Sequence, residues 1–186
     1  MNFDVIRPLF GGHMSQSQVD GTNAIAAAFA AVTPAVDPRW TAYGLATAFW
    51  ETAHTMQPIR EIGQGRGRAY GQPAGPWHQV YYGRGDVQET WLANYQHADA
   101  KLHALAVLKP EENLVQTPDL ALRPDVAGAI MVHGMIEGWF TGLGLPHFFN
   151  DHTTDWLNAR RIINGTDHAQ QISLIAQRFY KAIQAQ

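Results

Sequence analysis

The chain of 186 residues has the length of one domain, and with 46% hydrophobic and 16% charged residues it has the composition of a protein that buries a large apolar core. A formal net charge of −3, with thirteen Lys and Arg scattered along the chain, excludes the basic surface on which nucleic-acid binding depends. The absence of Cys excludes disulfides and thiol chemistry. We therefore expect a single domain over residues 1–186, monomeric and without a nucleic-acid partner.

The N-terminal segment MNFDVIRPLFGGHMSQ lacks the charged region followed by an apolar stretch that marks a secretory signal peptide. No run of residues reaches the roughly 18 apolar positions of a membrane span. We expect synthesis in the cytoplasm, no membrane insertion, and any export by another route.

The first predicted helix covers residues 15–32. Ser15-x-x-Gln18 can form a capping box at its start, and the Ala-rich sequence that follows favours close packing. A second helix is predicted to open with Asp37 as N-cap and Pro38 in the first turn, and to continue to about residue 55. This second helix carries Glu51.

Residues 57–85 lose the helical periodicity and are dense in Gly, Pro and aromatic residues. A segment of this length without regular structure is too long for a passive connection and is typical of a functional loop. Short extended segments at 79–82 and 86–90 flank Gly83 and Gly85, and we expect them to pair as a small β-hairpin.

Helical patterns return after Trp91, at residues 124–140, and from residue 167 to the C-terminal end. The last pattern has apolar residues at the spacing of an amphipathic helix: Ile172, Ile175, Ala176, Phe179 and Ile183. The sequence therefore predicts a mainly α fold, a helical bundle with a small β-hairpin and a groove on its loop-rich face.

Two glutamates stand at the start of this loop-rich region. Glu51 follows Phe49 and Trp50, and we expect these aromatic side chains to remove water from its carboxyl and keep it protonated, as a general acid requires. Glu61 lies beyond the helix and could face Glu51 across a cleft. Glycoside hydrolysis uses such a pair, one carboxyl to donate a proton and one to activate water. With sixteen Asp and Glu in the chain, the pairing alone does not define a site.

A more specific pattern follows, because residues 81–95 read YYGRGDVQETWLANY. This segment closely resembles the signature of glycoside hydrolase family 19, the family of class I chitinases and phage-type endolysins, which reads Tyr-x-Gly-Arg-Gly-x-x-Gln-x-(Ser or Thr)-x-x-x-Asn-Tyr. Upstream, Glu51-Thr52 resembles the acid motif of this family, and residues 161–165 (RIING) resemble its Ile-Asn-Gly motif. The resemblance implies an α+β, mainly helical, lysozyme-like domain that needs no cofactor and no metal.

The resemblance also implies roles for individual residues. Glu51 takes the role of the general acid, and Glu61 is the counterpart of the second carboxylate. The family positions that bind substrate or hold the attacking water are occupied by polar residues: Gln88, Thr90, Asn94 and Asn164. Their amide and hydroxyl groups suit N-acetylated sugars. Tyr82 and Arg84 also fall in the binding segment, where we expect them to shape the motif and its charge network.

The chain departs from the family at two positions, since Trp50 precedes the acid where many relatives have His, and Thr166 follows Ile-Asn-Gly where many have Gly. It also lacks the cysteines and several loops of plant chitinases, so the endolysin branch is the closer resemblance. We expect a lysozyme-like enzyme that cuts a β-1,4 bond between N-acetylated sugars of peptidoglycan with inversion, and that reaches the cell wall after release. A chitinase of the same family, acting on a chitin-like polysaccharide, is the alternative.

Three further alternatives stay open. The pairs Glu51/His54 and His133/Glu137 each lie on one predicted helix face, as in the metal sites of helical bundles. The groove could also serve a cell-wall-binding module without catalysis. Within the enzyme reading, Glu89 is the reserve candidate for the second carboxylate.

Overall fold

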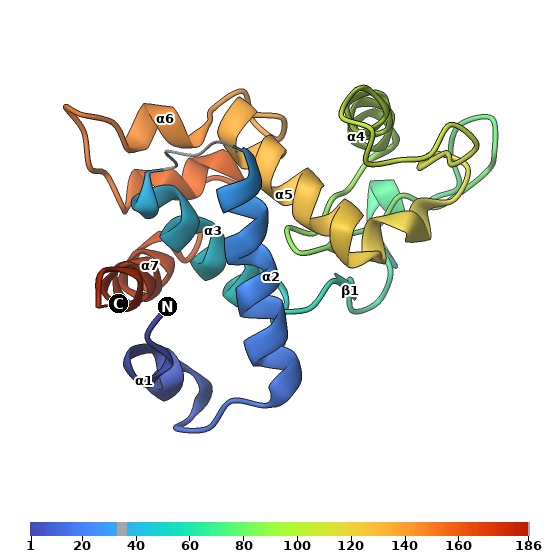
Figure 1. Ribbon diagram of the computed structural model, residues 1–186. Coiled ribbons are helices and arrows are strands. Elements are labelled where there is room, and N and C mark those ends of the chain that lie inside the picture. The colour runs from blue at the N-terminus through green and yellow to red at the C-terminus, as the bar shows by residue number, and fades with distance from the viewer. Residues whose placement is uncertain (33–36, 186) are drawn as a thin grey trace.

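The computed structural model describes residues 1–32 and 37–185 and shows a mainly helical molecule, as predicted (Figure 1). The α-helices and strands of this part of the chain follow in order: α1 (Phe3–Ile6), α2 (Gln16–Val32), α3 (Pro38–Glu51), β1 (Ile59–Arg60), β2 (Arg84–Gly85), α4 (Leu92–Ala104), α5 (Pro124–Glu137), α6 (Leu145–Phe148) and α7 (Ala169–Gln184). Short 3₁₀ helices lie between them: η1 (Arg7–Phe10), η2 (Ala69–Gly71), η3 (Pro118–Leu122) and η4 (Asn158–Ile162).

The starts of α2 and α3 confirm the capping signals in the sequence. At α2 the capping box forms in both directions, because the Ser15 N–H donates to Gln18 Oε1 at 2.8 Å and the Gln18 N–H donates to Ser15 Oγ at 3.3 Å. At α3 the Asp37 carboxylate accepts from the N–H of Arg39 at 2.9 Å. Local hydrogen bonds therefore fix where both helices begin.

Helix α3 forms the centre of the core. All of its residues from 42 to 49 are buried, so it packs on every side, against α2, α5 and α7. Close approach to α2 depends on Gly44, since a Cβ there would lie 2.3 Å from the Phe29 ring. From the other side α7 contributes Ile172, Ala176 and Phe179, all fully buried. The amphipathic spacing predicted for this last helix is confirmed.

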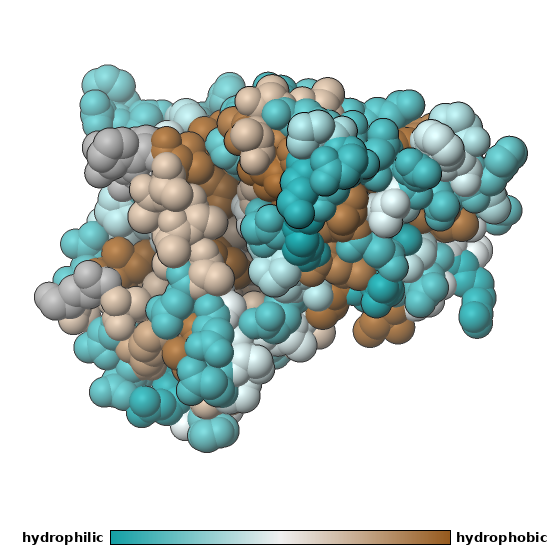
Figure 2. All heavy atoms as spheres, turned by 45° about the vertical axis from the view of Figure 1, so that its right-hand side comes forward, coloured by the Kyte–Doolittle hydropathy of each residue, from teal (hydrophilic) through white to brown (hydrophobic). Residues whose placement is uncertain are grey.

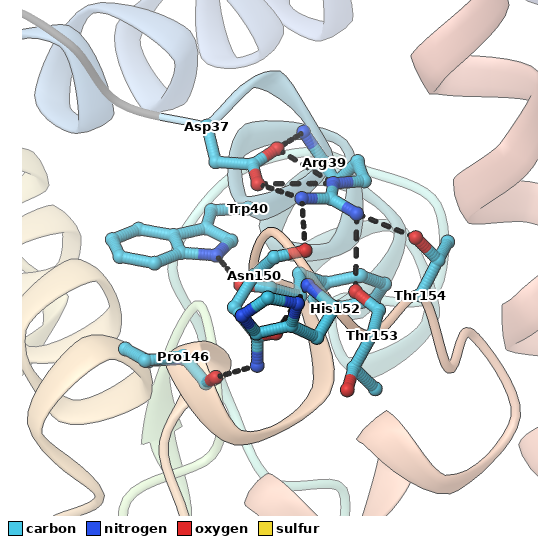
Figure 3. Close-up of polar contacts among 9 residues, drawn as sticks. Asp37, Arg39, Trp40, Pro146, Asn150, His152, Thr153 and Thr154 are labelled. Atoms are coloured by element: carbon cyan, nitrogen blue, oxygen red, sulfur yellow. Dashed lines mark hydrogen bonds and ion pairs between the residues drawn. The ribbon is translucent and has the colours of Figure 1, made fainter.

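The N-terminal end of α3 is tied to the segment that follows α6. Asp37 pairs with the Arg39 guanidinium, which donates to the carbonyl oxygens of Asn150 at 3.0 Å and Thr153 at 3.1 Å (Figure 3). Because these partners come from distant parts of the chain, the network holds α3 in one orientation. Glu51 lies at the opposite end of this helix.

Three predicted helix boundaries were wrong by a few residues. Helix α3 ends at Glu51 because Ala53 and His54 take left-handed backbone conformations. Helix α5 ends at Glu137, where Gly138 has a φ of +80° and caps the helix. Helix α7 begins at Ala169, after His168 with a φ of +55°. The first of these differences places Glu51 in the last turn of α3.

The predicted hairpin of residues 79–82 with 86–90 was wrong as a strand pair. The antiparallel sheet instead joins β1 to β2, with Ile59 opposite Gly85 and Arg60 opposite Arg84. Residues 84–89 fold back in a tight turn that is closed by two backbone hydrogen bonds between Arg84 and Glu89. The 81–95 segment therefore pairs with residues 59–60, directly before Glu61. Local sequence patterns do not reveal this pairing.

No helix within residues 1–32 and 37–185 is both long and apolar enough to cross a membrane.

Candidate active site

Two adjoining hollows open beside the C-terminal end of α3. One, of about 380 Å³, contains both Glu51 and Glu61. The other, of about 490 Å³, contains Glu51, Asn94 and Asn164. Four residues line both hollows: Glu51, Tyr70, Gln88 and Thr90. The hollows therefore form one continuous depression, which we call the Glu51 groove.

Glu51 meets a buried cation in this groove. The Arg160 guanidinium donates to Glu51 Oε1 at 2.7 Å, and the two side chains are only 5% and 17% exposed. A second donor of Arg160 binds the backbone oxygen of Asp167 at 3.1 Å, which fixes the guanidinium. The sequence predicted a carboxyl surrounded by aromatic side chains, and this partner was missed. Arg160 directly precedes the RIING segment, and this position was the signal in the sequence that could have identified it.

Glu61 follows β1 directly and faces the same hollow as Glu51. Its Oε1 accepts from the Tyr70 hydroxyl at 2.9 Å and its Oε2 from the Gly83 N–H at 3.1 Å. Its own N–H donates to the Gly83 oxygen at 2.7 Å. Both carboxylate oxygens are thus held by fixed donors. Tyr70, which sequence reasoning missed, joins the 57–85 loop to this site.

Gly83 lets the motif approach Glu61 closely. A Cβ at this position would lie 2.9 Å from Gln88 Oε1 and 3.3 Å from the Glu61 Cβ. Gln88 has a left-handed φ of +56°, and its Nε2 donates to the backbone oxygens of Ile59 and Gly85, both at 3.2 Å. The amide is therefore fixed between β1 and the 84–89 turn, with its side chain in the wall of the groove.

The structure brings most of the predicted site residues together in the groove walls: Glu51, Glu61, Gln88, Thr90, Asn94 and Asn164. Tyr82 and Arg84 line neither hollow. The buried Arg84 guanidinium stacks 3.6 Å from the centre of the Tyr82 ring, and its Nε donates to Asp119 at 2.8 Å. These contacts agree with the expectation that both residues shape the motif and its charge network, and a direct role of either residue in substrate binding stays a prediction.

Glu89, the reserve candidate, also lies in the groove wall. It is 4% exposed, and its Oε2 has no hydrogen-bond partner. Burial raises the pKa of this carboxyl to about 8, so it is neutral over most of the physiological range. A neutral carboxyl does not suit the role of a base, whereas Glu61 is held at both oxygens.

The two pairs considered for metal binding have other partners. The His54 ring stacks on Phe49 with ring centres 4.1 Å apart, and Glu51 pairs with Arg160. Glu137 pairs with Lys101 at 2.8 Å and lies 3.2 Å from His133. Throughout residues 1–32 and 37–185, no three His, Asp or Glu side chains gather closely enough to hold a metal ion.

The helices and the groove define a protein with a mainly α, lysozyme-like fold whose cleft carries carboxyl groups from separate elements. Known structures share this fold. Chitinase C from Streptomyces griseus HUT6037 superposes with a TM-score of 0.62 at 23% sequence identity, over 97% of this chain and 74% of that chain. A mutant of chitinase C superposes with a TM-score of 0.57 at 23% identity, over 97% and 89% of the two chains. No protein-family model and no curated protein sequence matches the chain.

Proposed function

We propose that this protein is a glycoside hydrolase that cuts a β-1,4 bond between N-acetylated sugars with inversion of the anomeric centre. The observation that carries the proposal is the placement of Glu51 and Glu61 in one hollow, on elements that approach it separately. The likeness in fold to a chitinase and the match of residues 81–95 to the family 19 signature support the same reaction.

In this reaction Glu51 donates a proton to the leaving oxygen of the glycosidic bond. Arg160 holds Oε1, which leaves Oε2 to carry the proton into the groove. After the transfer, the guanidinium stabilises the carboxylate that remains. Arg160 is thus a positioning residue for the acid.

Glu61 accepts a proton from a water molecule that attacks the anomeric carbon from the opposite face. An ionised carboxylate is an acceptor at both oxygens, which matches the donors supplied by Tyr70 and Gly83. Inversion requires the two carboxyl groups to stand about 6.5 to 9.5 Å apart, so that water fits between them. The amide and hydroxyl groups of Gln88, Thr90, Asn94 and Asn164 would bind the substrate.

The proposed substrate is the glycan of peptidoglycan. The chain lacks the cysteines and several loops of plant chitinases, and this closer resemblance to the compact endolysin branch favours peptidoglycan. A chitin-like polysaccharide is the second candidate, favoured by the fold of chitinase C. Both polymers present N-acetylglucosamine, and they differ in the lactyl-peptide substituent.

Parallel digestion of purified peptidoglycan and chitin oligomers, with mass analysis of the new reducing ends, tests both candidates. We expect muropeptide products to form faster than chitin fragments. The opposite order would assign a chitinase. Binding to both polymers without new reducing ends would assign a wall-binding module.

A further inference from the structure

A further hollow lies between α2 and α5, with a lining that shares no residue with the Glu51 groove. Its volume is about 520 Å³, within the roughly 300–1,000 Å³ typical of small-molecule sites. We call it the α2–α5 cavity. Its walls are mainly small apolar groups on facing helices: Ala24, Ala27, Ala28 and Ala31 of α2, and Gly128 of α5. Figure 2 shows weakly hydrophobic side chains gathered along this face of the molecule.

The charged groups of the α2–α5 cavity all have the same sign. Asp20, Asp86 and Asp125 line it, and no Lys, Arg or His does so among the described residues. Asp20 accepts from Gln16 Nε2 at 2.8 Å, and Asp125 accepts from Arg123 Nε at 2.7 Å. The carboxylates of the two helices are therefore partnered, but the third is not.

Asp86 is the unpartnered group. It is 3% exposed, its Oδ1 is buried without a hydrogen bond, and no described residue donates to its carboxyl. Burial raises the pKa of this carboxyl to about 7. A buried polar group without a partner carries a free-energy penalty, which a donor brought by a ligand would relieve.

We propose that the α2–α5 cavity binds a small molecule that combines an apolar body with an ammonium group. The apolar body lies against the alanines of α2, and the ammonium group donates to Asp86. An ammonium group supplies both the donors that Asp86 lacks and the charge opposite to that of the cavity. The N-terminal end of α5 disfavours a cation, but Asp125 in its first turn offsets this dipole.

This site differs from the Glu51 groove, although both use the 84–89 turn. Gln88 and Glu89 line the groove, whereas Asp86 lines the α2–α5 cavity. The proposal therefore does not depend on the glycoside hydrolase function. Its test needs no assay of catalysis.

Titration of the whole protein with n-hexylamine, n-hexanol and hexanoate, followed by backbone amide NMR, tests the proposal. We expect saturable shifts in residues 24–31 and 125–128, with hexylamine binding tightest and hexanoate weakest. Asp86→Asn keeps the side-chain volume and should weaken hexylamine at least about tenfold while leaving hexanol within about twofold. Asp151→Asn, at an exposed carboxylate outside the cavity, is the matched control.

A second pair of variants tests the cavity by shape. Ala27 lines the cavity and Ala30 does not, although both are exposed on α2. Ala27→Leu should abolish hexylamine binding, whereas Ala30→Leu should bind as the unmodified protein does. The two alanine variants and the relative affinities of the three ligands test the proposal even if Asp86→Asn does not fold. The proposal is overturned if no saturable shift occurs, if hexanoate binds as tightly as hexylamine, or if Asp86→Asn leaves hexylamine binding unchanged.

Discussion

Arg160 and Glu51 lie 109 positions apart in the chain and are joined by a hydrogen bond of 2.7 Å. Both side chains are largely buried, so each removes from the other the penalty of an unpaired charge. The pair links the end of α3 to η4 across the Glu51 groove. Its energetic coupling can be measured apart from any catalysis.

The first prediction concerns this coupling. Arg160→Met should lower the free energy of unfolding by about 3 kcal/mol, because it leaves the Glu51 carboxylate without its partner. In the double variant Arg160→Met/Glu51→Gln, the loss of unfolding free energy should be smaller than the sum of the losses in the two single variants by about 1 kcal/mol or more. Urea unfolding of the four proteins measures the coupling. The same cycle on the exposed pair of Asp4 and Arg7 should give a coupling within about 0.5 kcal/mol of zero.

The second prediction concerns the general acid. Glu51→Gln should fold normally and lose at least about 100-fold in activity on peptidoglycan, because the amide cannot give a proton to the leaving oxygen. Initial rates and a thermal melt of the same preparation measure both effects. Glu111→Gln, at an exposed position outside the groove, should keep the full rate. A loss of less than about tenfold for Glu51→Gln would remove this residue from the mechanism.

The third prediction concerns the second carboxylate. Glu61→Gln should also reduce activity by about 100-fold, because its amide cannot accept the proton of water. Glu89→Gln should keep most of the rate, because Glu89 is neutral and its amide has the same shape. NMR of the first product should show the α anomer. A near-full rate for Glu61→Gln together with a large loss in Glu89→Gln would make Glu89 the base in place of Glu61. A first product with the β configuration would exclude inversion.

The fourth prediction concerns the dependence of stability on pH. Burial raises the pKa of Glu89 to about 8 and that of Asp86 to about 7, well above their ordinary values. Between about pH 4 and pH 8 the folded state therefore keeps protons on these two carboxyl groups that the unfolded state releases. Their contribution to the free energy of unfolding is most favourable below about pH 4 to 5. It should fall by on the order of a few kcal/mol as the pH rises to about 8.

Urea unfolding at about pH 5 and about pH 8 measures this loss. The double variant Asp86→Asn/Glu89→Gln should lose much less stability between the two values, whereas Glu111→Gln should behave as the unmodified protein. An equal loss in all three proteins would show that other groups control the effect.

The fifth prediction concerns metal ions. Activity on peptidoglycan should survive saturating EDTA, because two carboxyl groups and a water molecule suffice for inverting hydrolysis. Loss of activity that Zn²⁺ or Mn²⁺ restores would instead support the metal site considered for Glu51 and His54.

The sequence predicted those parts of the fold that depend on neighbouring residues. The starts of α2 and α3 follow from Ser15, Gln18 and Asp37, which bond to the backbone within a few positions. The buried face of α7 follows from its apolar spacing. Both kinds of signal are local, and both are confirmed.

The contacts that the sequence did not predict are formed between distant segments. The pairing of β1 with β2 involves two residues on each strand, too few for a recognisable pattern. Arg160 reaches Glu51 only because the chain folds back on itself. The contact of Tyr70 with Glu61 is an exception, since the two residues lie nine positions apart in a loop without a periodic pattern. For Tyr82 and Arg84, the motif identified an important segment but did not show which side chains face the groove.

The packing of α3 against α7 has a consequence for the order of folding. These two helices come from opposite halves of the chain, and α3 is covered only when α7 has docked on it. Contacts between segments so far apart close a long loop and form slowly. During synthesis α3 leaves the ribosome before η4 and α7, so a nascent chain that has not yet reached η4 holds Glu51 without Arg160. The groove is therefore completed only after η4 and the residues that follow it have been made, and a shorter nascent chain lacks an assembled site.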